Sequence, residues 1–187
     1  IFAPTSRQAS CQYGIGVDGR VGMYVEEKNR SWCSSSNAND QRAITIECAS
    51  DATHPYAFND TVYAKLIELC TDICKRYGKT KLLWFGDKTK TLNYEPASNE
   101  MVLTVHRWFA NKSCPGDWMY ARMGDLASKV TAKLGGSAGG TEKPADNQAL
   151  YRVQTGAFSN KTNADAMLQK VKDAGFDTYM VKVDNLY

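Results

Sequence analysis

The sequence predicts an α/β protein in which helices flank a central mixed β-sheet. Residues 12–25 alternate apolar and polar side chains on either side of Asp18-Gly19, a pattern typical of an antiparallel hairpin. Residues 60–77 instead repeat apolar side chains every three or four positions, as an amphipathic helix does. Because short apolar strands and amphipathic helices then follow one another along the chain, we expect helices packed around one sheet.

The strands are predicted from side chains that alternate between two faces. In the hairpin, Asp18-Gly19 takes the position of a two-residue turn. In residues 43–48, Ile44, Ile46 and Cys48 share one face, and Thr45 and Glu47 share the other. Residues 81–85 read as a short buried strand, and residues 86–100 as a loop beside the site.

Two long helices are predicted within the first 135 residues. The first begins near Asp60, a good N-cap candidate, and ends at Gly78. Its Cys70 and Cys74 should pack as small hydrophobic residues. The second carries apolar residues from Met119 to Leu134 and stops at Gly135-Gly136, so we assign its methionines to the core.

Composition limits the classes of protein that the chain can belong to. The 187 residues are 43% hydrophobic and 23% charged, enough for one sizeable core and a smaller module. A net charge of +3 is too small to indicate a nucleic-acid partner, and no apolar run approaches the ~20 residues of a membrane span. The six cysteines show no framework pattern, so we expect mostly reduced thiols. We expect a monomer.

A flexible linker is predicted at residues 135–149, which are rich in Gly, Ser and polar residues. It separates a domain at residues 1–134 from a module at residues 150–187. In that module we expect a strand at 150–158, a helix at 163–174 and a strand at 177–183.

His106 and Cys114 lie eight residues apart around a Pro/Gly turn and form the candidate metal pair. Zinc binds imidazole nitrogen and thiolate sulfur, and a catalytic zinc site uses three protein ligands and leaves one position for water. The spacing alone also fits a surface histidine and an inert thiol. The other histidine, His54, lies in a turn-forming loop and is not expected to be a ligand.

Other candidate site residues are polar or aromatic. Glu47 lies in mid-strand, where a carboxylate is costly to bury unless it is used or paired. Trp32 interrupts a polar loop and could be a platform for sugar or peptide, or could anchor the loop to the core. We predict that the substrate contacts Tyr13, Trp32, Asn39 and Trp108.

Four segments in order resemble the zinc-dependent N-acetylmuramoyl-L-alanine amidases, the amidase-2 family that is related to peptidoglycan recognition proteins. The segments are Ser6–Val21, Ser31-Trp32-Cys33, Asn39–Glu47 and His106–Pro115. The resemblance covers residues 1–135 and implies an amidase-2 fold. It also implies cleavage of the amide bond between muramic acid and L-alanine in bacterial peptidoglycan.

The resemblance also implies roles for individual residues. Zn²⁺ would be held by His106, Cys114 and one further histidine, and Glu47 would act as general base and then acid. Lys112 would stabilise the oxyanion, although a solvated lysine explains its position equally well. In the family the first zinc histidine lies on the first strand, in a segment that would precede Ile1 in this chain. We therefore expect an N-terminally truncated domain that binds zinc weakly and is inactive as it stands.

The chain departs from the family at two places near the expected site. Cys11 stands where many relatives carry a tyrosine or a histidine, so the family's catalytic tyrosine cannot be assigned to this position. We favour a small buried thiol as the interpretation of Cys11. Cys33 falls where relatives often have histidine, and an acid–base role there is in doubt.

The segment Tyr151–Phe176 resembles the SPOR module, which binds peptidoglycan glycan strands that lack peptides. We expect only its first half here. Together, the two resemblances imply peptidoglycan as the partner and a place in the extracellular space or cell wall, as a secreted autolysin or a phage endolysin. Two other interpretations stay open: a non-catalytic peptidoglycan recognition protein, and a structural zinc or redox site built from the cysteines.

Overall fold

The computed structural model describes residues 6, 8–135, 158–173 and 180, and the chain divides into two compact units. The units are Ile1–Asn147 and Gln148–Tyr187. Short strands and helices alternate in the first unit, so the predicted α/β class is confirmed. The linker predicted at residues 135–149 lies outside the described residues except for Gly135.

A small mixed sheet carries the first half of the chain. Its strands are β1 (Tyr13–Ile15), β2 (Val21–Met23) and β3 (Ile46–Cys48), in the order β2-β1-β3. β1 pairs antiparallel with β2 and parallel with β3. Ile15 is buried while Val21 and Met23 are exposed, because β2 is the edge strand of the sheet.

The hairpin turn between β1 and β2 is one residue longer than predicted. The Gly16 amide donates to the Arg20 carbonyl over 2.8 Å, and the Gly19 amide donates back to Gly16 over 2.9 Å. Gly19 has φ +78°, the left-handed conformation that closes a three-residue loop. The two-residue turn was therefore wrong, although Asp18-Gly19 do lie in the turn.

The expected single sheet is present as two separate ladders. β4 (Lys81–Leu83) pairs in parallel with β5 (Glu100–Val102), and no strand among the described residues joins this ladder to β3. Residues 86–100, predicted as a loop, contain α3 (Lys88–Asn93). The Asp87 side chain caps this helix by accepting from the Lys90 amide. The segment was predicted as a loop because it is polar, and the N-cap residue was overlooked.

Helix α2 (Asp60–Arg76) is the predicted amphipathic helix. Its N-cap is Asn59 rather than Asp60, because the Asn59 Oδ1 accepts from the Val62 amide over 2.8 Å. Cys70 and Cys74 are buried on its apolar face, as predicted. The helix stops before Gly78, which has φ +65°.

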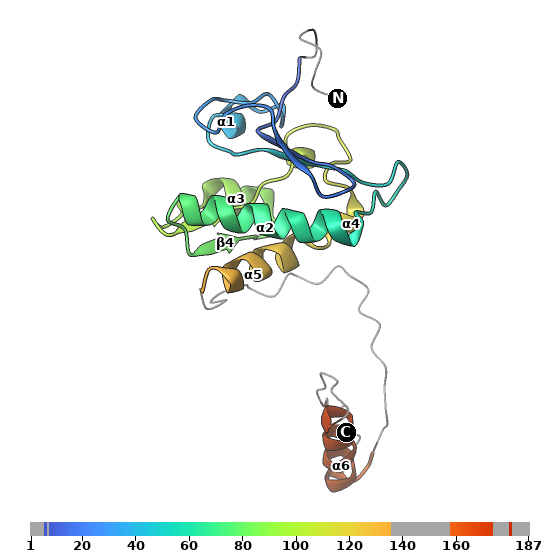
Figure 1. Cartoon of the computed structure of the whole chain (residues 1–187). Helices are drawn as coiled ribbons and strands as arrows, with labels where there is room; N and C mark the ends of the chain where they lie inside the picture. Colours follow the sequence, from blue (N-terminus) through green and yellow to red (C-terminus); the bar gives the residue numbers. More distant parts are fainter. Residues whose placement is uncertain (1–5, 7, 136–157, 174–179, 181–187) are drawn as a thin grey trace. The chain divides into compact units, whose positions relative to one another are not determined.

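The predicted closing helix is broken into α4 (Asp117–Tyr120) and α5 (Met123–Lys133). The buried face is nevertheless the one predicted, since Met119, Met123, Leu126 and Val130 are all buried. α2 packs against β1 and against α5, and α5 packs on β4, so α2 lies between the blue strands and α5 (Figure 1). Two short elements, α1 (Asn37–Asp40) and the 3-10 turn η1 (His106–Trp108), lie beside the site.

In the second unit the structure describes α6 (Lys161–Asp173), close to the helix predicted at residues 163–174. The strands predicted at 150–158 and 177–183 fall almost entirely outside the described residues. No helix among the described residues is long and apolar enough to cross a membrane.

Candidate active site

Glu47 lies in the middle of β3, opposite Gly14 of β1. Side chains alternate along a strand, so Glu47 projects away from the face on which Ile46 and Cys48 pack against the core. The Cys33 thiol donates a hydrogen bond to Glu47 Oε1 over 3.5 Å. The sheet therefore presents a half-buried carboxylate with a thiol beside it.

His106 follows β5 at the start of η1, and buried Val105 anchors the chain immediately before it. Its Nε2 lies 3.3 Å from the Ser35 hydroxyl. The next residue, Arg107, donates its amide to the Cys114 carbonyl over 3.0 Å, and its guanidinium reaches the Ser113 carbonyl and Asp117. These bonds close the loop between His106 and Cys114 and so bring the two residues to one place.

Cys114 begins the turn that leads into α4, where Gly116 has φ +84° and lies against Tyr56. Partial burial, and then the negative charge of Glu47, raise the pKa of the Cys114 thiol. The same two causes raise the pKa of Cys33 to about 12. Both thiols are therefore neutral near pH 7, and a metal bound to Cys114 has to displace its proton.

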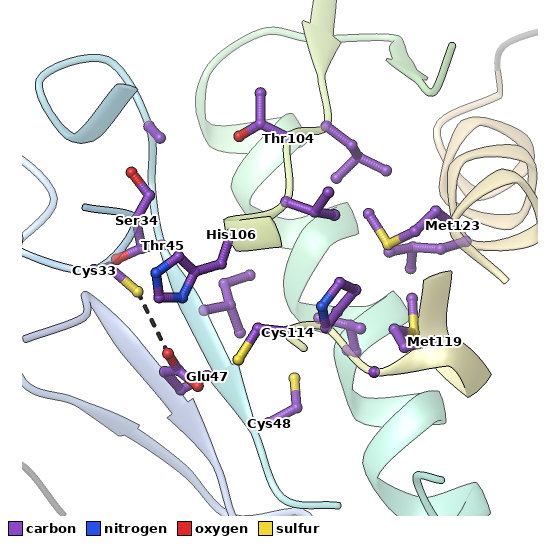
Figure 2. A pocket seen from close by; sticks show the side chains of 18 of the residues that line it. Cys33, Ser34, Thr45, Glu47, Cys48, Thr104, His106, Cys114, Met119 and Met123 are labelled. Carbon is purple, nitrogen blue, oxygen red and sulfur yellow. Dashed lines mark hydrogen bonds between the residues drawn. The ribbon is translucent and has the colours of Figure 1, made fainter. Parts of the chain in front are cut away.

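These groups surround one cavity of about 440 Å³. Figure 2 shows the side chains of Cys33, Glu47, His106 and Cys114 gathered along one part of its wall. The opposite part is apolar, formed by side chains from α2, α4 and α5 that include Leu66, Cys70, Met119, Met123 and Leu126. The cavity therefore combines a polar reactive wall with an apolar base, as ligand sites commonly do.

His106 and Cys114 are the types of ligand that zinc binds, but a catalytic zinc site needs three protein ligands and these are two. An imidazole and a thiol are the ligands that zinc takes. Within the described residues, however, no group of three or more His, Cys, Asp or Glu side chains is placed to hold a metal ion. His54 lies elsewhere, with its Nε2 2.9 Å from Asp117.

Of the other predicted site residues, only Asn39 lines the cavity. Its amide donates to the Ser34 hydroxyl and accepts from Thr104, each over 3.0 Å, so it joins α1 to the chain before His106. Lys112 is exposed on the loop between His106 and Cys114, outside the cavity lining.

The three predicted aromatic contacts lie outside the cavity lining. The Tyr13 hydroxyl donates to Glu27 over 2.7 Å on the face of the sheet that covers α2. Trp108 stacks on Trp84 with the ring centres 4.9 Å apart. Trp32 is exposed and lies under the Arg30 guanidinium.

Sequence reasoning missed the residues that hold the loop at 33–36. Asp40 is buried and accepts from the Cys33 amide and from the amide and hydroxyl of Ser34. The adjoining Ser35 reaches His106. The Asp in the Asn39-Asp40 pair was visible as part of a motif, but a run of serines carries no periodic signal that would show which one faces the site.

The fold and the cavity define an α/β protein with a carboxylate, an imidazole and a thiol around one pocket. Comparison with known families makes this specific: residues 2–117 match the N-acetylmuramoyl-L-alanine amidase family, and residues 147–187 match the SPOR domain. Because the first match covers more than half of the chain, the protein belongs to the N-acetylmuramoyl-L-alanine amidase family. Both predicted resemblances are confirmed.

One curated relative is an uncharacterized protein of Aquifex aeolicus (strain VF5), 47% identical over 47 residues. The match covers 25% of this chain and 20% of that protein, so it carries no assignment of function. No solved structure matches the chain.

Proposed function

We propose that the chain is a peptidoglycan hydrolase that cleaves the amide bond between N-acetylmuramic acid and L-alanine. The observation that carries the proposal is that Glu47, His106 and Cys114, all inside the family match, line the same cavity. The three residues come from segments far apart in the sequence, from β3 and from the loop after β5. Chance similarity in one motif would not bring them together.

His106 and Cys114 would hold a zinc ion together with a third ligand from outside the described residues. Bound zinc supplies a water of lowered pKa and polarises the substrate carbonyl. Glu47 would take the proton from the attacking water and deliver it to the leaving amine, and the Cys33 hydrogen bond fixes its Oε1. Lys112, on the loop between the two metal ligands, would stabilise the developing oxyanion.

We also propose the division of labour along the chain. Residues 1–134 would carry the hydrolase, residues 135–149 a tether, and residues 150–187 a wall-binding module. Peptidoglycan would then be both the substrate and the anchor, and the protein would act at the cell wall. We propose that it does so as a monomer. Trp32 remains the predicted aromatic contact that is exposed to solvent, with Tyr13 and Trp108 as the less accessible candidates.

The test is zinc content and cleavage of purified peptidoglycan, for this chain and for a version extended upstream through one more strand. We expect the extended protein to bind one zinc and to release muropeptide amines. Glu47→Ala should lower the cleavage rate roughly 10²- to 10⁴-fold without removing the metal. Glu95→Ala, an exposed glutamate away from the cavity, is the matched control.

A non-catalytic recognition protein is the second candidate, favoured by the lack of a third metal donor among the described residues. If neither version binds zinc and both still bind peptidoglycan, this candidate replaces the hydrolase.

A further inference from the structure

The loop formed by residues 33–36 carries a backbone conformation that its sequence does not favour. Ser35 has φ +63°, the left-handed region that residues other than glycine, asparagine and aspartate rarely adopt. Such a conformation persists only where the surroundings hold it in place, and it often marks a functional position. The contacts on both sides of Ser35 show what holds it.

The buried Asp40 carboxylate fixes the residues before Ser35. Its Oδ1 accepts from the Ser34 hydroxyl over 2.6 Å and from the Ser34 amide over 3.0 Å, and its Oδ2 lies 3.2 Å from the Cys33 amide. Hydrogen bonds to an ionised carboxylate are stronger than neutral ones. After Ser35, the Ser36 hydroxyl caps α1 by accepting from the Asn39 amide over 3.3 Å. Ser35 is therefore clamped from both sides.

The clamped loop places one group against each of two side chains that line the cavity. The Cys33 thiol meets Glu47, and the Ser35 hydroxyl meets His106 Nε2. A histidine that ligates a metal through one ring nitrogen usually donates the other N–H to a nearby acceptor, which fixes its tautomer and orientation. The Ser35 oxygen is in the place of that acceptor.

We propose that Ser35, held in its strained conformation by Asp40, is a positioning residue for His106. It accepts the Nε2–H of the imidazole and leaves Nδ1 as the metal-binding nitrogen. This inference rests on the proposed function for the metal, but the hydrogen bond itself is a property of the metal-free chain.

The first experiment therefore needs no metal and no activity. With two histidines in the chain, ¹⁵N-edited NMR resolves two imidazoles, and His54 provides the internal reference. We expect a slowly exchanging Nε2–H signal from His106 that is lost in Ser35→Ala. Ser50→Ala is the matched control, because Ser50 lines the same cavity and its hydroxyl bonds to the Asp51 carbonyl instead. An unchanged His106 signal in Ser35→Ala, or an Nδ1–H signal in the wild type, overturns the proposal.

The second experiment separates positioning from loop stability. Glycine adopts φ +63° without strain, so Ser35→Gly should unfold at the same temperature as the wild type or higher. In the extended version, the affinity of Ser35→Gly for Zn²⁺, measured by competition with a chelating dye, should nevertheless fall roughly 10- to 100-fold below that of the extended wild type. Ser35→Asn keeps a side-chain acceptor and tolerates the conformation, so it should retain most of the affinity.

Equal zinc affinity in Ser35→Gly and the wild type overturns the positioning role. If neither this chain nor the extended version binds zinc, the proposed metal function fails, while the NMR comparison still decides whether Ser35 holds His106.

Discussion

The Glu27 carboxylate shows how one residue can link stability to pH. Arg76 donates to both of its oxygens, over 2.6 and 2.7 Å, and the Tyr13 hydroxyl donates over 2.7 Å. The hydrogen bonds from Arg76 are the main cause that lowers the pKa of Glu27 from 4.5 to about 2. A carboxyl with a lower pKa in the folded state stabilises the fold above pH 4.5, and this contribution is lost as the pH falls from 4.5 toward 2.

Glu27→Gln should therefore lower the free energy of unfolding by about 2 kcal/mol at pH 7 and by much less near pH 2. Urea unfolding at several pH values measures this difference. Glu26→Gln is the matched control: the Glu26 pair with Lys28 is exposed and should contribute less than about 1 kcal/mol. Parallel pH profiles for Glu27→Gln and the wild type would contradict the assignment.

The sequence could indicate the candidate site only through residues whose side chains have a recognisable chemistry. A mid-strand carboxylate and a His–Cys pair made Glu47, His106 and Cys114 candidates, but alone they also fit a solvent-facing glutamate, a surface histidine and an inert thiol. The resemblance to the amidase family selected them. Ser35 and Asp40 were not selected, since their roles depend on hydrogen bonds that close only when α1 meets the chain before His106. A contact of that kind has no periodic trace in the sequence.

Among the secondary-structure elements, α2 carries a contact at its N-terminus that ties it to the hairpin. Asn59 Oδ1 caps the Val62 amide, and Asn59 Nδ2 donates to the Val17 carbonyl over 2.9 Å. Asn59→Ala should cost about 1–2 kcal/mol of stability because it removes both bonds. Asn59→Asp keeps the cap and should cost less, and thermal unfolding of the two variants measures the part due to the hairpin contact. Equal losses in both variants would show that the cap itself contributes little.

The buried faces of the strongly periodic elements were predicted correctly, but the break between α4 and α5 and the start of α2 were not. The apolar face of α2 was evident, but its N-cap moved from Asp60 to Asn59, because either side chain can accept from the first turn. The hairpin turn changed from two residues to three for a similar reason: Asp18-Gly19 suits both loops, and the register of Ile15 with Val21 decides between them. The division into two ladders could not be predicted, since it depends on which strand edges meet.

At the scale of the whole molecule, the buried hydrophobic cluster that holds the first unit extends from Ile15 to Val130. None of its residues comes from residues 158–173 or 180, the part of the SPOR match that the structure describes. Stability of the first unit should therefore depend on its own core, while attachment to the wall should depend on the second unit.

Ending the chain after Asn147 should consequently separate the two properties. The unfolding temperature of the first unit, followed by tryptophan fluorescence, should stay within a few degrees of the full chain, because the four tryptophans all precede residue 148 and the core is intact. Sedimentation with purified peptidoglycan should show weaker binding by the shortened protein. Val130→Ala is the opposite control: it truncates a fully buried side chain in the core and should lower the unfolding temperature, while sedimentation with peptidoglycan should be unchanged at temperatures where the first unit stays folded. A large drop in unfolding temperature on removing residues 148–187 would instead mean that the second unit stabilises the first, and that the two act as one structural body rather than as a hydrolase carrying a separate anchor.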